Sequence, residues 1–168
     1  METNLNTLTI LAEVTTAFVA FSAIVASLRV TFGQKLSQFQ QLLVHFFTES
    51  GMLIVSITLL PLVLTGFWQD ELIVARITTV YTFVITGTYL LFYIRRRLGI
   101  DAPTPLPSLF VMIGYGIWLP LLAITATGIF WQPSLEFITA FCFWGLFSSV
   151  LIFDTFLTAF VHSEPPSA

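Results

Sequence analysis

The sequence predicts an all-α membrane protein with five transmembrane helices, and three observations support this prediction. Hydrophobic residues make up 57% of the 168 residues, and the mean hydropathy is +0.93. Only 9% of the residues are charged, whereas soluble domains carry roughly 25%. Five apolar runs each approach the length of about 20 residues that a helix needs to cross a bilayer. We expect one transmembrane domain, residues 1–168, with spans at about 8–30, 42–67, 72–94, 109–131 and 134–161.

The first span, residues 8–30, has two different faces. Because a helix turns by about 100° per residue, small and polar side chains collect on one side and larger apolar ones on another. In a membrane helix, a small and polar face indicates close helix packing or a water-lined path. We therefore expect the other helices to gather around this span. Its polar face is a candidate path, made of Glu13, Thr16, Ala20, Ala23 and Ser27.

The remaining spans follow from apolar runs and helix-breaking residues. The helix of the second span could begin as early as Leu36, where helical spacing of apolar residues starts. The connection 95–107 contains three prolines and Gly99, which do not continue a helix. Pro133 suits the first turn of the fifth span. The 18 phenylalanines favour a lipid-facing shell.

Basic residues predict the orientation of the chain. Lysine and arginine collect on the cytoplasmic side of membrane proteins, and tryptophan favours the interface. All but one of the basic residues fall at the ends that join the first span to the second and the third to the fourth. We therefore expect the N-terminus outside, the C-terminus inside, and Trp68 and Trp131 at the outer interface. The basic residues concerned are Arg29, Lys35, Arg95, Arg96 and Arg97.

A short motif occurs twice in the chain. Leu60-Pro61-Leu62 precedes a Thr-Gly pair near the end of the second span, and Leu119-Pro120-Leu121 precedes another near the end of the fourth. One interpretation is that spans two–three and four–five are two copies of one helical hairpin, related by an axis along the membrane normal. The other is that proline and Gly-aromatic turns recur by chance in membrane hairpins.

Two ionisable residues lie at matching depth near the outer side. Glu13 is about five residues into the first span, and Arg76 is about four residues into the third. Ionisable groups at depth usually face a partner or a cavity. We expect Glu13 and Arg76 to pair, within one chain or between protomers, in a structural or a functional role. Alternatively, Arg76 extends outward to the interface and leaves Glu13 facing a pore.

A second polar cluster is expected near the inner side. His45 and Glu49 are four residues apart and share a helix face, and Asp154, His162 and Arg29 come from other spans at similar depth. Three interpretations remain open: a proton or cation path, a structural network in which Arg29 neutralises a carboxylate, and a metal or haem site that uses both histidines. Because the ligand spacing is not diagnostic of a metal, we predict no metal and no cofactor.

The first half of the chain resembles a group of bacterial proteins. Leu11-Ala12-Glu13 with Ala17-Phe18, Ala20-Phe21 and Leu28-Arg29 is similar to the first span of uncharacterised bacterial multi-span membrane proteins. Leu59-Leu60-Pro61-Leu62 is similar to their second span. The resemblance implies a bacterial inner membrane, and it implies no activity and no functional residue.

These observations favour a small homo-oligomeric channel that conducts protons or cations. The expected partners are the bilayer, further copies of the chain, and ions or protons, with no nucleic acid. The sequence has no glycine-rich phosphate loop and no serine, histidine and carboxylate set at matching depth, so we do not expect an enzyme. Two alternatives remain open. One is an accessory or scaffold subunit of a larger membrane complex, and the other is a proton-coupled transporter that moves at Pro61 and Pro120.

Overall fold

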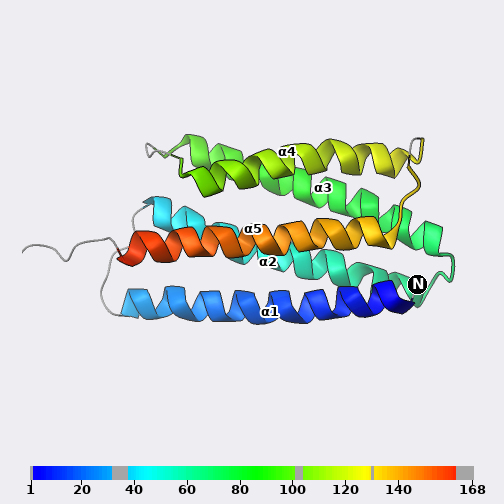
Figure 1. Ribbon diagram of the computed structural model, residues 1–168, viewed down its shortest axis with the longest axis horizontal. Helices are drawn as coiled ribbons and strands as arrows, with labels where there is room; N and C mark the ends of the chain where they lie inside the picture. Colours follow the sequence, from blue (N-terminus) through cyan, green and yellow to red (C-terminus); the bar gives the residue numbers. More distant parts are fainter. Residues whose placement is uncertain (1, 32–37, 101–103, 130, 162–168) are drawn as a thin grey trace, which may run out of the picture.

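The chain forms a bundle of five long helices in the computed structural model, which describes residues 2–31, 38–100, 104–129 and 131–161 (Figure 1). Each helix is long and apolar enough to cross a membrane, and no strand occurs within the described ranges. This arrangement confirms the all-α class and the number of spans. The helices are α1 (Glu2–Thr31), α2 (Gln38–Thr65), α3 (Glu71–Leu98), α4 (Leu106–Thr127) and α5 (Leu135–Val161).

Several helices begin or end at other residues than predicted, because local groups, and not the mean hydropathy, decide where a helix stops. The carboxylate of Asp70 accepts a hydrogen bond from the Leu72 backbone N–H at 2.9 Å and fixes the start of α3. At its other end, α3 continues through the arginine run to Leu98, although we expected a connection from residue 95. Helix α4 stops at Thr127, four residues before the expected end, because Gly128 adopts a left-handed conformation with φ of 69°.

Helices α2 and α5 occupy the centre of the bundle. Helix α1 packs against α2 and α5, and α4 packs against α3 and α5. In Figure 1, α1 lies along one edge, α3 and α4 lie along the opposite edge, and α2 and α5 run between them. The expectation that the other helices gather around the first span is therefore wrong. Helices α2 and α5 contribute most of the large buried side chains. Opposite sides of each of these two helices are buried, whereas α1 is buried along one narrow seam only.

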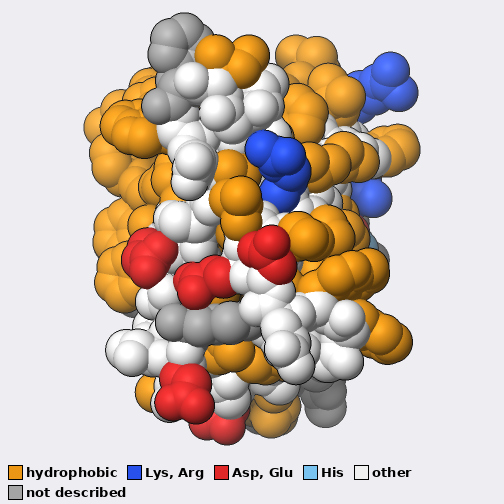
Figure 2. Space-filling model, turned by 90° about the vertical axis from the view of Figure 1, so that its right-hand side faces the viewer, with side chains coloured by type: hydrophobic (Ala, Val, Ile, Leu, Met, Phe, Trp, Pro, Cys, Tyr) orange, Lys and Arg blue, Asp and Glu red, His pale blue; other side chains and the backbone are white. Residues whose placement is uncertain are grey.

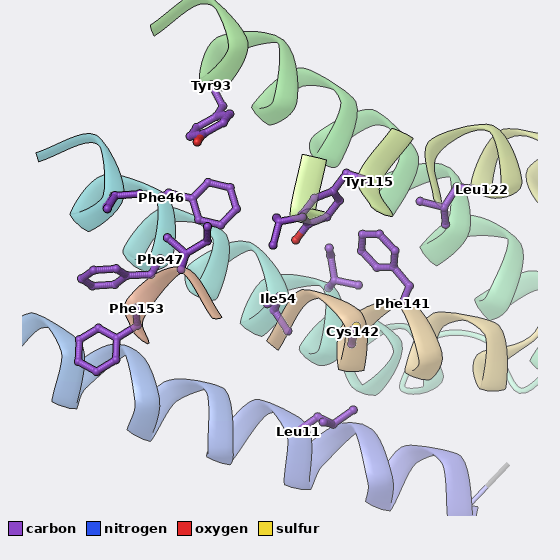
Figure 3. Close-up of a cluster of buried hydrophobic side chains, with 14 of the residues drawn as sticks. Leu11, Phe46, Phe47, Ile54, Tyr93, Tyr115, Leu122, Phe141, Cys142 and Phe153 are labelled. Atoms are coloured by element: carbon purple, nitrogen blue, oxygen red, sulfur yellow. The ribbon is translucent and has the colours of Figure 1, made fainter. Parts of the chain in front are cut away.

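Aromatic side chains fill the core near the C-terminal end of α1 (Figure 3). The Phe47 ring of α2 meets the Phe153 ring of α5 edge to face, with ring centroids 5.3 Å apart, and it also contacts Phe156. Nearer the start of α5, Phe141 packs against Tyr115 of α4. Other phenylalanines, including Phe21, point outward. The phenylalanines are thus divided between core and surface, and the prediction of a lipid-facing shell is correct for only part of them.

The α1–α2 contact depends on close backbone approach. Gly51 lies so near α1 that an added side-chain carbon would collide with Val19. The neighbouring α1 side chains Thr15 and Ser22 are completely buried in the same seam. Small residues allow this approach, which maximises van der Waals contact between membrane helices.

We therefore expect Gly51→Ala to destabilise the protein by about 1–3 kcal/mol, the usual cost of overpacking a well-packed contact. The matched control is Gly116→Ala in α4, where an added carbon would meet nothing within 4 Å. Unfolding of both variants in detergent micelles, followed by circular dichroism, measures the difference. Equal stability of the two variants would contradict the close α1–α2 contact.

The two ends of the bundle differ in charge. Figure 2 views the end at which α1 begins, and acidic side chains are spread across it. We call this end the acidic end; Glu2, Asp70, Glu71 and Glu136 lie in or next to the first turns of helices that start there. We call the opposite end, where the last turn of α3 carries Arg95, Arg96 and Arg97, the arginine end. Lys35 and the side chain of Arg29 lie outside the described residues.

Candidate functional site

The predicted path residues form one exposed stripe on α1. All five are exposed, and together they run along most of the helix. The opposite side of α1 is buried against α2 and α5, with Leu8, Ala12, Thr15 and Ala26 among its contacts. The candidate path thus lies on the outside of the single chain. We call this set the α1 stripe, and it consists of Glu13, Thr16, Ala20, Ala23 and Ser27.

The hydroxyl groups of the α1 stripe are turned back onto their own helix. Thr16 Oγ1 donates to the Ala12 carbonyl at 2.7 Å, and Ser27 Oγ donates to the Ala23 carbonyl at 2.8 Å. These bonds satisfy the hydroxyls inside the membrane and leave a low, even surface. The stripe residues also recur every seven residues, at 13, 20 and 27 and at 16 and 23, which is the spacing of a left-handed helix–helix seam. A second helix could therefore approach α1 closely along this face.

Glu13 and Arg76 do not pair within one chain. Both side chains are exposed, and no ion pair between them occurs among the described residues. Helices α1 and α3 are not in contact, because α2 and α5 lie between them. Arg76 instead lies beside Gly128, with Nη2 2.8 Å from where a side-chain carbon of that residue would be. This position is at the carboxyl end of α4, which favours a cation. Pairing between protomers stays a prediction.

At the arginine end, Glu49 of α2 binds Arg96 of α3. The Arg96 Nη1 atom donates to both carboxylate oxygens, at 2.8 and 2.9 Å. His45, one turn earlier on α2, places Nδ1 3.5 Å from the Glu49 Oε1 atom. The sequence indicated the His45–Glu49 pair but missed Arg96, which we interpreted only as an orientation signal. The one available signal was the depth of Arg96, because the arginine run ends α3 at the same end of the bundle, but depth alone does not show that α2 and α3 are neighbours.

Asp154, the other member of the predicted inner cluster whose side chain is described, is not joined to this group. Asp154 is exposed on α5, and no hydrogen bond or ion pair among the described residues links it to Glu49 or His45. His162 and the side chain of Arg29 lie outside the described residues, so a pair between Arg29 and a carboxylate, and a site with both histidines, stay predictions. Among the described side chains, Arg96 neutralises Glu49.

We expect the Glu49–Arg96 pair to stabilise the α2–α3 contact by about 0.5–1 kcal/mol, because the Arg96 side chain is half exposed and exposed ion pairs rarely contribute more. A double-mutant cycle with Glu49→Gln and Arg96→Gln, measured by unfolding in micelles, gives this coupling energy. The matched control replaces Arg95, the exposed neighbour, in the same cycle. Coupling as large with Arg95 as with Arg96 would contradict the pairing.

A buried hydroxyl pair joins the two central helices. Ser50 of α2 and Ser149 of α5 lie 2.9 Å apart, oxygen to oxygen, and both side chains are buried. Sequence reasoning had no signal for this contact, because serines are common in membrane helices and the two positions are far apart in the chain. The pair connects the central helices at a point where Gly145 of α5 also approaches Ile54 of α2.

Comparison of the chain with protein-family models, with curated proteins and with solved structures finds no match. The α1 stripe and the Glu49–Arg96 pair are therefore the features from which a function is inferred.

Proposed function

We propose that the protein is a small homo-oligomeric channel for protons or cations in a bacterial inner membrane, in which the α1 stripe of each protomer faces the path. One observation carries the proposal. The stripe is exposed from Glu13 to Ser27, while the other residues of this stretch are packed or apolar. Other copies of α1 would cover a small and polar face of this length.

The Glu13 carboxylate supports a water-filled environment for the stripe. A charged side chain facing hydrocarbon costs roughly 2.5–3.5 kcal/mol on insertion scales and more in simulations. Glu13 lies about three turns into α1 and has no ion partner among the described residues. A ring of such carboxylates around a common axis would be hydrated and would attract cations, as acidic rings do in cation channels.

The packing of the interior supports a path between protomers. Phe47, Phe141 and Phe153 are almost completely buried and fill the space between the central helices. Such packed aromatic side chains leave little room for water. A path between protomers therefore fits the structure better than a path through the middle of one chain. The α1 stripe is the long polar surface that the described residues offer instead.

The proposal also assigns a direction. With the arginine end on the cytoplasmic side, Glu13 lies in the outer half of the path, about three turns from the start of α1, and selects for cations. Thr16, Ala20, Ala23 and Ser27 line the narrow part. At the inner end, Glu49 with its Arg96 partner and the exposed Asp154 would modulate the entry or exit of ions.

Two measurements on purified protein test this function. In liposomes, we expect proton or potassium flux that scales with the amount of protein, and native mass spectrometry should show a symmetric homo-oligomer. Absence of flux together with a monomeric mass would contradict the channel. That outcome would favour an accessory subunit, in which the α1 stripe binds a different protein. Flux that requires a proton gradient would instead favour a coupled transporter.

A further inference from the structure

A cavity opens between α4 and α5 near the acidic end of the bundle. Its volume is about 400 Å³, which is within the range of known ligand sites. The walls toward the middle of the bundle are Trp118 and Leu121 of α4 and Phe137 of α5. Trp118 stacks at a tilt against Phe137, with ring centroids 5.4 Å apart, so the inner wall is aromatic and well packed.

The polarity of the cavity changes along its length. The part between the helices is apolar, whereas the rim carries the side chains of Gln132 and Ser134 from the α4–α5 connection. The Ser134 hydroxyl oxygen accepts a hydrogen bond from the Phe137 backbone N–H at 3.3 Å, and the Ser134 hydroxyl also hydrogen-bonds with the Glu136 carboxylate. Trp131, also on the rim, is mostly exposed, as indoles at a membrane interface are.

This gradient matches a membrane lipid. An apolar hollow holds water poorly and takes up apolar molecules instead, and in a bilayer the apolar molecules at hand are acyl chains. The polar rim lies where α4 ends and α5 begins, which is the level of the headgroups for a helix that spans the membrane. Glu136, which hydrogen-bonds with the rim residue Ser134, would repel an anionic headgroup and tolerate a zwitterionic one.

We propose that this cavity is a lipid site: one acyl chain of a zwitterionic phospholipid lies between Trp118, Leu121 and Phe137, and its headgroup binds at Gln132 and Ser134. The phosphate accepts a hydrogen bond from the Gln132 amide. The site fills the gap that α4 leaves against α5 and holds the outer parts of the two helices together. It does not depend on the proposed channel, because the α1 stripe lies on the opposite edge of the bundle.

Lipid retention tests the site. Protein is purified in detergent, exposed to an equal mixture of phosphatidylethanolamine and phosphatidylglycerol, washed, and analysed by native mass spectrometry. We expect one phosphatidylethanolamine to be retained per chain. In Leu121→Trp, where the indole fills the cavity, we expect about tenfold less retention, equivalent to ~1.4 kcal/mol of binding free energy. The matched control is Ile117→Trp, one turn earlier on an exposed part of α4 that does not line the cavity.

A second variant covers the case in which Leu121→Trp fails to fold. Thr125→Leu enlarges a buried side chain in the cavity wall by less than the indole of Leu121→Trp does. It should therefore lower lipid retention partially. The proposal is overturned if the wild type retains no lipid, if all variants retain the same amount, or if phosphatidylglycerol is retained equally well. A change of oligomeric state in Leu121→Trp, without loss of lipid, would instead identify the cavity as a contact between copies of the chain.

Discussion

Replacing Glu13 by glutamine is expected to lower cation flux through the reconstituted protein about tenfold, which corresponds to ~1.4 kcal/mol in the barrier. The substitution keeps the size and hydrogen-bonding ability of the side chain and removes its charge. If the carboxylates of several protomers form the outer ring of a path, cations lose the electrostatic attraction that concentrates them there. The measurement is potassium or proton uptake into liposomes that hold equal amounts of protein.

The matched control for this prediction is Glu136→Gln. Glu136 lies in the first turn of α5 at the acidic end, is exposed, and accepts a hydrogen bond from Asn4 at 2.7 Å that glutamine can also accept. The substitution removes one negative charge from the same half of the bundle without altering the α1 stripe. We expect near-normal flux. A Glu13→Gln protein that conducts as well as the wild type, with unchanged selectivity, would exclude Glu13 from the path.

The second large effect is expected from Ala20→Phe in the middle of the α1 stripe. A phenyl ring at this position prevents close approach along the stripe, and overpacking costs about 1–3 kcal/mol at each affected contact. Because every protomer of a symmetric assembly carries the change, the cost is repeated around the ring. We expect the oligomer to dissociate or its path to close, with loss of flux beyond the tenfold effect of Glu13→Gln.

Ile113→Phe provides the control for bulk on an exposed helix surface. Ile113 is exposed on α4, far from the α1 stripe. We expect its mass in native spectra and its flux to equal those of the wild type. If Ala20→Phe likewise keeps both the mass and the flux of the wild type, the α1 stripe faces lipid and not another copy.

The helices were predictable because each depends on a local property of the chain. Runs of about 20 apolar residues suffice to identify membrane spans. Their ends were less accurate, because Arg95, Arg96 and Arg97 are good helix formers that extend α3 by one turn. Gly128, in contrast, ends α4 early through its backbone conformation. Neither effect appears in a hydropathy average.

The packing face of α1 could not be predicted from the sequence. Thr15, Ser22 and Ala26 form the buried seam, and Thr16, Ala20 and Ala23 form the exposed stripe, so both faces carry the same residue types. In water, burial of apolar surface would distinguish them, but lipid removes this driving force. Similarly, shared depth placed Glu49 at the correct end of the bundle but could not identify Arg96 as its partner, because depth does not reveal which helices are neighbours.

Disulfide cross-linking between copies of an Ala20→Cys variant in native membranes tests the central claim most directly. The native Cys142 is completely buried and can remain in place. A disulfide forms when Cα atoms come within roughly 4.4–6.8 Å of one another, so a bond reports that two α1 stripes face one another across the narrow part of the path. We predict a covalent dimer after mild oxidation for Ala20→Cys and none for Ile113→Cys. Monomer alone for Ala20→Cys, under oxidation that links cysteines placed elsewhere on the lipid-facing surface, would contradict the account.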